Sequence, residues 1–256
     1  MAVMGAPRTF SEEGRQAPHA VLTAYYRTPE EKRRFVGTIF DSSAPDYDRI
    51  ERLLGLGSGG WYRRGALQRA GLAPGMRVLD VAVGTGLVAC EAKRIVGPAG
   101  LVIGIDPSLG MMAAADGLAG VPLVQGRAEA LPFADASFDF VSLGFALRHV
   151  DDVATTFREF RRVLRPGGQL VMLEITRPRS RAGRALLAFY MRGLVPLVSR
   201  ALARRRETER LFRYYWDTIE ACVPPATVLD ALAAHGFSDP QRKVQLGIFS
   251  EYRATA

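Results

Sequence analysis

The chain has 256 residues, 48% of them hydrophobic, and a formal net charge of +8 at pH 7. This length fits one domain with additions, and no uninterrupted apolar run reaches the roughly 18 residues that predict a membrane-spanning helix. The N-terminus has no apolar secretory segment, so we expect a cytoplasmic protein. The two cysteines and three histidines lack metal-type spacing, which argues against a disulfide framework and against a metal site.

The first residues of the chain predict a loose arm followed by a short helix. Met1–Gln16 is polar and irregular, which is typical of disorder. His19–Tyr26 predicts the start of a helix, and Pro29 predicts its break.

The segment before the first strand predicts a further short helix, with Asp41 or Ser42 as a suitable cap. A helical segment in this position packs over the carboxyl edge of the sheet or along its side. Two interpretations stay open. The segment either packs in the ordinary way, or it forms a lid over a ligand site with Tyr47 near the ligand.

A strand–turn–helix–strand unit follows, and the functional prediction depends on it. The short Val-rich run Val78–Val83 predicts a buried parallel strand. Gly84 and Gly86 allow a sharp turn and a close approach to a ligand, ahead of a helix over Leu87–Val96. A second buried strand ends in Asp106, where a carboxylate can accept hydrogen bonds from both hydroxyls of a ribose.

The glycine pair alone does not identify a cofactor. Gly84-x-Gly86-x-x-Ala89 with Asp106 also fits the loose NAD fingerprint, and a tight turn that binds nothing would have the same pattern. Asp80 lies four residues before Gly84, where a carboxylate can order the glycine loop and bind a cation. S-adenosylmethionine is cationic at its sulfonium and amino groups, whereas Asp80 would repel a pyrophosphate.

Strands and helices continue to alternate after this unit. The predicted elements are a helix over Ser108–Leu118, strands over Val121–Gln125 and Phe138–Leu143, a helix over Asp151–Leu164, a turn over Arg165–Gly168 and a strand over Gln169–Glu174. In an open α/β sheet, ligands bind at the carboxyl ends of the strands. This rule points to the residues that follow the fourth strand, Gly144–His149.

The segment Arg177–Arg213 contains eleven arginines and is too long for a simple connection. It predicts two or more helices that cap the substrate site. Three interpretations of its charge stay open: a solvated face, docking to anionic lipid headgroups, or an anionic substrate. A helix over Ala226–His235 and strands over Val244–Leu246 and Phe249–Ala254 complete the predicted elements.

Several motifs are recognisable together. They are Leu-Asp-Val-Ala-x-Gly-Thr-Gly (79–86), Gly-x-Asp-x-Ser (104–108), Ala-Glu-Ala-Leu-Pro-Phe-x-Asp-x-Ser-Phe-Asp (128–139), Arg-Val-Leu-x-Pro-Gly-Gly (162–168), Phe-Asp-x-x-Ala-x-x-Tyr-Asp (40–48) and Phe-x-Leu-Arg (145–148). This set resembles class I S-adenosylmethionine-dependent methyltransferases, and among them the UbiE/COQ5 (MenG) family of C-methyltransferases of ubiquinone and menaquinone synthesis. Arg127, Gly144 and His149 depart from that family's residues, which suggests a divergent member.

The resemblance implies a Rossmann-like class I methyltransferase fold of the α/β class. This fold has a seven-stranded, mostly parallel sheet with helices on both faces, an N-terminal helical lid and a helical cap insert. We expect residues 1–35 to form a partly disordered arm and residues 36–256 to form a single methyltransferase domain with its cap insert at 177–225.

The resemblance also implies a function and a set of site residues. The expected reaction is S-adenosylmethionine-dependent C-methylation of a quinone, a hydroquinone or another phenolic small molecule. The residues expected to bind the cofactor are Tyr47, Asp80, Gly84, Thr85, Gly86, Asp106, Arg127, Ala128 and Gly144.

Two further residues are catalytic candidates. His149 titrates near neutral pH and follows the fourth strand, so it can serve as the base that activates a phenol; the alternative is a hydrogen bond to the next loop. Arg148 can stabilise an oxyanion or a substrate carboxylate or phosphate, or it can form a surface salt bridge with Asp151 or Asp152. The tyrosines and tryptophan at 214–216 favour cap core over a binding platform.

Other functions stay open as alternatives. They are a non-methylating, cyclase-like descendant, a methyltransferase for an anionic substrate such as a prenyl diphosphate, and a binding module without chemistry. The motifs of nucleic-acid methyltransferases are absent, so we expect a small-molecule acceptor and no nucleic acid. The sequence leaves open a homodimer and peripheral contact with an anionic membrane.

Overall fold

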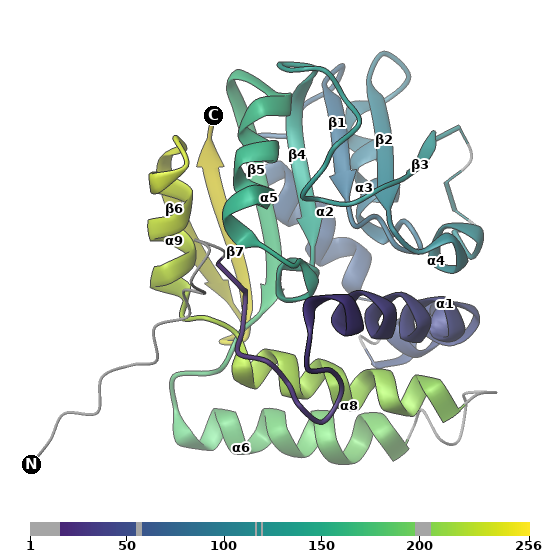
Figure 1. Ribbon diagram of the computed structural model, residues 1–256. Helices are drawn as coiled ribbons and strands as arrows, with labels where there is room; N and C mark the ends of the chain where they lie inside the picture. Colours follow the sequence, from purple (N-terminus) through teal and green to yellow (C-terminus); the bar gives the residue numbers. More distant parts are fainter. Residues whose placement is uncertain (1–15, 55–57, 116, 119, 198–205) are drawn as a thin grey trace, which may run out of the picture.

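A seven-stranded sheet in the order β3-β2-β1-β4-β5-β7-β6 forms the centre of the computed structural model (Figure 1), which describes residues 16–54, 58–115, 117–118, 120–197 and 206–256. Adjacent strands from β3 to β5 are parallel, and β7 is antiparallel to β5 and to β6. The strands are β1 (Arg77–Val81), β2 (Leu101–Asp106), β3 (Leu123–Gln125), β4 (Phe138–Gly144), β5 (Leu164–Ile175), β6 (Ser238–Gln245) and β7 (Phe249–Thr255). The predicted seven-stranded, mostly parallel sheet is confirmed.

Two apolar clusters cover the two faces of the sheet. One includes Phe157 and Phe160 of α5 and Leu232 of α9, and the other includes Leu67 of α2 and Val88 of α3. Because both faces are covered, every apolar side chain of β1 and β4 is buried, as is usual for parallel strands in such folds. The helices on the two faces are α2 (Gly59–Arg69), α3 (Leu87–Val96), α5 (Val153–Val163) and α9 (Pro225–Ala234).

A third cluster lies below the carboxyl edge of the sheet, where α1 crosses and α6 and α8 run beneath it (Figure 1). Its members include Ile50 of α1, Met191 and Tyr214, all 5% exposed or less. This layer confirms the predicted helical cap. Its elements are α1 (Pro29–Leu54), α6 (Arg181–Phe189), the π-helical turn η2 (Tyr190–Leu194) and α8 (Arg206–Ala221).

The N-terminal helix differs from the sequence prediction. His19–Tyr26 contains only turns and an isolated bridge, and Pro29 begins α1 instead of ending a helix. This position suits proline, because the first helical residue needs no N–H donor. Asp41 and Ser42 lie inside the helix and do not cap it. Packing against the third cluster stabilises the helix across Pro45, against the usual breaking effect of proline.

Other boundaries differ by a few residues. The predicted helix over Ser108–Leu118 is shorter, with α4 at Leu109–Ala113, and a 3-10 turn, η1 (Leu147–His149), precedes α5. The predicted turn at Arg165–Gly168 is a bulge inside β5, because the pairing with β4 passes from Leu164 directly to Gln169.

The N-terminal arm is only partly testable. The predicted disorder of Met1–Gln16 lies outside the described residues, apart from Gln16, which is buried and donates its N–H to Asp152 Oδ1 over 3.0 Å. The predicted division between residues 35 and 36 falls within α1 and stays a prediction.

Candidate active site

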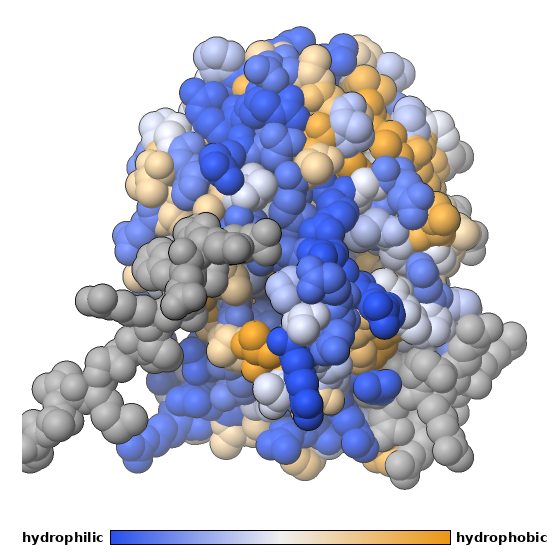
Figure 2. All heavy atoms as spheres, in the orientation of Figure 1, coloured by the Kyte–Doolittle hydropathy of each residue, from blue (hydrophilic) through white to orange (hydrophobic). Residues whose placement is uncertain are grey.

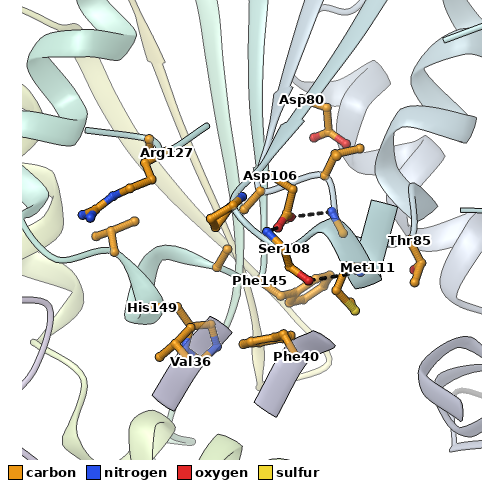
Figure 3. A pocket seen from close by; sticks show the side chains of 18 of the residues that line it. Val36, Phe40, Asp80, Thr85, Asp106, Ser108, Met111, Arg127, Phe145 and His149 are labelled. Carbon is orange, nitrogen blue, oxygen red and sulfur yellow. Dashed lines mark hydrogen bonds between the residues drawn. The ribbon is translucent and has the colours of Figure 1, made fainter. Parts of the chain in front are cut away.

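A cavity of about 220 Å³ lies where the order of the strands reverses, at the carboxyl ends of β1 and β4, and α1 closes it from the other side (Figure 3). Open α/β sheets bind their ligands at this point. Nine of the predicted site residues line the cavity: Tyr47, Asp80, Gly84, Thr85, Asp106, Arg127, Ala128, Gly144 and His149.

Asp106 organises the glycine turn at one end of the cavity. Its Oδ2 accepts the N–H of Gly84 over 2.8 Å and its Oδ1 accepts the N–H of Ser108 over 2.8 Å (Figure 3). Gly84 has φ +55°, a conformation that favours glycine. Burial raises the pKa of Asp106 to about 6, although both N–H groups oppose the shift, so Asp106 is mostly ionised at neutral pH.

The Gly84 N–H of the glycine loop bonds to Asp106 and not to Asp80, and the predicted ordering of the loop by Asp80 stays a prediction. Asp80 lies in β1, next to β2, which carries Asp106. Its Oδ1 accepts the hydroxyl of Ser142 from β4 over 2.6 Å. Its Oδ2 is buried and has no hydrogen-bond partner among the described residues. Burial raises the pKa of Asp80 to about 7. A buried carboxylate oxygen that faces a cavity without a partner is suited to bind a cation.

Arg63 is a cavity residue that the sequence did not reveal. It comes from α2, is 6% exposed, and donates to Glu51 Oε1 over 2.7 Å. Its Nε is buried and unpaired within the described part of the chain, so Arg63 and Asp80 are two residues of the cavity lining that each have one polar atom without a partner there. Arg63 shares a helix face with the buried residues Ala66 and Leu67, and this spacing is the signal that could have identified it.

The opposite charges of Arg63 and Asp80 fit the cofactor implied by the motifs. The methionine end of S-adenosylmethionine carries an ammonium and a carboxylate, which match an unpaired carboxylate oxygen and an unpaired guanidinium N–H. The ribose hydroxyls match the ionised carboxylate of Asp106. The described residues therefore fit this cofactor at both ends.

Two predicted site residues do not line the cavity. Gly86 begins α3 at φ +87°, and a Cβ there would lie 2.4 Å from Leu118 Cδ1, so its role is close packing. Arg148 is 1% exposed and donates to Glu174 Oε2 over 2.5 Å, and its Cζ lies 4.8 Å from the ring centre of Tyr215. The predicted surface salt bridge of Arg148 is wrong, because β5 supplies a buried partner that lies 26 residues away in sequence.

His149 lies at the other end of the cavity, beside Val36 and Phe40 of α1 (Figure 3). Its ring stacks on Tyr214 and Tyr215 at 5.4 and 5.6 Å between ring centres. Both ring nitrogens are buried and have no hydrogen-bond partner within the described residues. The predicted alternative, a hydrogen bond to the next loop, is therefore not found there.

Burial holds the pKa of His149 well below its usual range, and the positive charge of Arg148 adds to this effect. The imidazole is therefore neutral at physiological pH and can accept a hydrogen bond from a hydroxyl group. Tyr47 lines the cavity and accepts the hydroxyl of Tyr215 over 3.1 Å, and its predicted contact with the cofactor stays a prediction.

The helix α1 is attached to the cofactor end of the cavity by two carboxylates, seven residues apart. Asp48 Oδ1 accepts the hydroxyl of Thr85 over 2.5 Å. Asp41 Oδ1 accepts the hydroxyl of Ser108 over 2.5 Å and the N–H of Gly110 over 2.9 Å. The two aspartates lie on one side of the helix, so the Phe-Asp-x-x-Ala-x-x-Tyr-Asp motif fastens α1 over the glycine turn.

An ion-pair network crosses the rim of the cavity between α1 and the loop after β3. Asp151 pairs with Arg33 of α1 at 3.0 Å and with Arg127, and Arg127 also contacts Glu129 at 3.3 Å. Arg127 thus lies at the predicted position in the wall, and its guanidinium is held at the rim.

The sequence profile of the ubiE/COQ5 methyltransferase family matches residues 27–253 of the chain. A relative from Geobacter sulfurreducens named ubiquinone/menaquinone biosynthesis C-methyltransferase UbiE is 35% identical over 236 residues, which cover 89% of this chain and 90% of the relative. This level of identity over nearly the full length of both chains is strong evidence of common ancestry.

Solved structures agree with the fold. A SAM-dependent methyltransferase from Aquifex aeolicus is 18% identical and has a TM-score of 0.57, with 90% of this chain and 99% of that one covered. The [4+2]-cyclase SpnF is 17% identical with a TM-score of 0.61, and 87% of this chain and 95% of that one are covered. At these identities the likeness shows the fold alone, so the second match does not favour the cyclase-like alternative.

Proposed function

This chain belongs to the ubiE/COQ5 methyltransferase family, a family of S-adenosylmethionine-dependent enzymes, and from that premise we propose that it methylates a ring carbon of a hydroquinone or related phenol. The observation that carries the proposal is the aromatic end of the cavity, where His149 presents two unpaired ring nitrogens among Phe40, Tyr214 and Tyr215. A flat phenol fits aromatic walls, and its hydroxyl needs one acceptor.

In the proposed site, Asp106 holds the ribose, and Asp80 and Arg63 hold the ammonium and carboxylate of the methionine end. Gly84, Thr85 and Ala128 also line the cavity, and the family resemblance assigns Ala128 to the adenine. The bound cofactor supplies an electrophilic methyl group on a sulfonium. The protein's part is to align the acceptor behind that methyl group and to exclude water. The contacts of Asp41 and Asp48 hold α1 over the cavity and so support the exclusion of water.

His149 performs the proton transfer in this proposal. A phenol gains electron density at its ring carbons when its hydroxyl bond weakens, so a neutral imidazole that accepts the hydroxyl proton activates the carbon. Arg148 does not touch the cavity; it acts as a positioning residue that supports the ring of Tyr215 and disfavours early protonation of His149.

The function is tested by incubating the purified enzyme with methyl-labelled cofactor and a short-chain demethylated naphthohydroquinone under reducing conditions. We expect a product that is one methylene heavier and carries the label on a ring carbon. Two outcomes would contradict C-methylation of this substrate class. In one, no member of a panel of hydroquinones and catechols takes up the label; in the other, the label is found only on oxygen.

Cofactor affinity should rise with pH up to about 7. Because burial raises the pKa of Asp80 to about 7, the free carboxyl is protonated below that value, and a bound ammonium requires the carboxylate. Binding therefore releases a proton at lower pH, and the Kd should increase about tenfold per pH unit between roughly 6.5 and 5.5. Calorimetry in two buffers of different ionisation enthalpy measures both quantities.

The matched variant is Asp80→Asn, which should bind weakly and lose the part of the pH dependence that Asp80 causes between roughly pH 6.5 and 5.5. The raised pKa also means that ionisation of Asp80 costs stability, so the contribution of this residue to the stability of the free protein falls as pH rises from about 4 to 7. A wild-type Kd that is constant across this range would rule out Asp80 as the ammonium ligand.

The remaining predictions concern partners and location. The expected acceptor is a small molecule, whereas the homodimer and the cytoplasmic location stay predictions. Within the described ranges, no helix is both long and apolar enough to cross a bilayer.

A further inference from the structure

The helical segment at the lower edge of the cap has two unlike faces. It comprises α6, the π turn η2 and the residues up to 197. On its inner face Leu187, Met191 and Val195 are 7%, 5% and 1% exposed and pack in the cap cluster. These three residues account for the packing of the segment against the rest of the protein.

The outer face carries large apolar side chains that nothing among the described residues covers. Leu186 is 70% exposed, Phe189 71%, Leu194 42% and Leu197 66%. A π turn takes about one residue more than an α turn. One α turn and one π turn together therefore take about eight residues, and residues eight apart lie on the same side of this segment. Leu186 therefore aligns with Leu194, and Phe189 aligns with Leu197. The π turn keeps all four on one stripe.

The charged residues of the segment itself and of the residues just before it are all arginines. From Arg177 to Leu197 the sequence contains five arginines and no acidic residue. Arg181, Arg184 and Arg192 are exposed on the segment itself, and Figure 2 shows hydrophilic side chains at the lower left, over the start of α6. Arg184 approaches Glu220 of α8 at 3.6 Å, so the positive charge of the segment is only slightly offset.

Leucine and phenylalanine side chains beside arginines are suited to one kind of surface. In an interfacial helix the apolar side chains enter the acyl region while the arginines contact anionic headgroups. A nucleic acid would use the arginines but leave the four apolar side chains in water. We propose that the outer face of residues 181–197, which we call the α6 face, docks onto an anionic lipid bilayer.

This proposal does not depend on the methyl acceptor. The α6 face lies on the far side of α1 and α8 from the sheet (Figure 1), and none of its residues lines the cavity. Lipid binding and methyl transfer can therefore be measured and altered separately.

The test uses co-sedimentation of the full chain with vesicles. Vesicles of phosphatidylglycerol and phosphatidylcholine in equal parts should bind the protein at low salt, and vesicles of phosphatidylcholine alone should bind at least about tenfold more weakly. Exchanging Leu186 and Phe189 together (Leu186→Ser, Phe189→Ser) should weaken binding at least about tenfold. Arg181→Gln and Arg192→Gln should each weaken it about fivefold.

Leu109→Ser is the matched control, because Leu109 is 59% exposed on α4, away from the α6 face; its lipid binding should equal that of the wild type. The circular dichroism of every variant should match the wild type, since the exchanged side chains are exposed. The proposal is overturned if anionic vesicles do not bind at low salt, or if the double variant binds as well as the control. It is also overturned if the protein binds RNA but not vesicles, or if the double variant only dissociates a dimer.

Discussion

Replacing Asp106 by alanine should weaken cofactor binding at least about 100-fold. Two hydrogen bonds from the ribose to a charged acceptor are each worth about 1.5–3 kcal/mol, and their sum corresponds to a factor of roughly 10² to 10⁴. The same carboxylate holds the N–H groups of Gly84 and Ser108, so the variant also loosens the turn. Calorimetric titration with S-adenosylhomocysteine measures the loss without turnover.

Ser108→Ala separates the ribose contact from the loosening of the turn. It removes the cap of α4, where Met111 N–H donates to Ser108 Oγ over 3.0 Å, and one of the contacts to Asp41. It leaves the carboxylate of Asp106 in place. We expect an affinity within about fivefold of the wild type, because the Asp106 carboxylate and its bond from the Ser108 N–H stay in place. An Asp106→Ala protein that binds as tightly as the wild type would remove the basis for the cofactor site.

The central strand–turn–helix–strand unit was predictable because its signals are local. A short Val-rich strand, two glycines that adopt positive φ and a helix over Leu87–Val96 follow one another within about twenty residues, and all are found. Asp106 was likewise predictable, because its position at the end of β2 follows from the βαβ pattern. Its hydrogen bond to Gly84 was not, since the direction of that N–H depends on the turn.

The N-terminal helix shows where local signals fail. Pro29 predicts a break and Asp41 predicts a cap, yet one helix begins at Pro29 and runs to Leu54. Its stability comes from contacts with α8 and with the glycine turn, which are distant in sequence. Propensity is a weak guide where tertiary packing covers one whole face of a helix.

Arg148 and Arg63 show the same limit within the site. The sequence places Arg148 at the active edge of the sheet, but Glu174 of the adjacent strand draws its side chain into the interior. The spacing of Arg63 with Ala66 and Leu67 could mark it as a buried residue of α2, but its place in the cavity follows only from the tertiary fold. The backbone position of a charged residue can be predicted from the pattern, whereas its partner is chosen by the tertiary fold.

The chemistry proposed for His149 depends on a balance of charge. Its low pKa, caused by burial and by Arg148, makes an isolated imidazolium unfavourable in the free protein. The bound cofactor would supply a sulfonium charge that is lost on methyl transfer, so a proton taken up by His149 would replace that charge instead of adding to it. The histidine can therefore be a poor base at rest and an effective acceptor in the transition state.

His149→Phe should lower kcat by about 10² to 10⁴ while the Kd of the cofactor stays within about threefold. Phenylalanine retains the aromatic contacts with Tyr214 and Tyr215 but cannot accept a proton, so only the chemical step is affected. His235→Phe is the matched control, and its rate should equal that of the wild type. His235 lies outside the cavity, and among the described residues its Nδ1 bonds to the carbonyl of Ala231.

The wild-type kcat should also be independent of His149 ionisation from about pH 6 to 8, because a depressed pKa leaves the imidazole neutral there. A single-turnover rate for His149→Phe within threefold of the wild type would show that another group, or water, takes the proton.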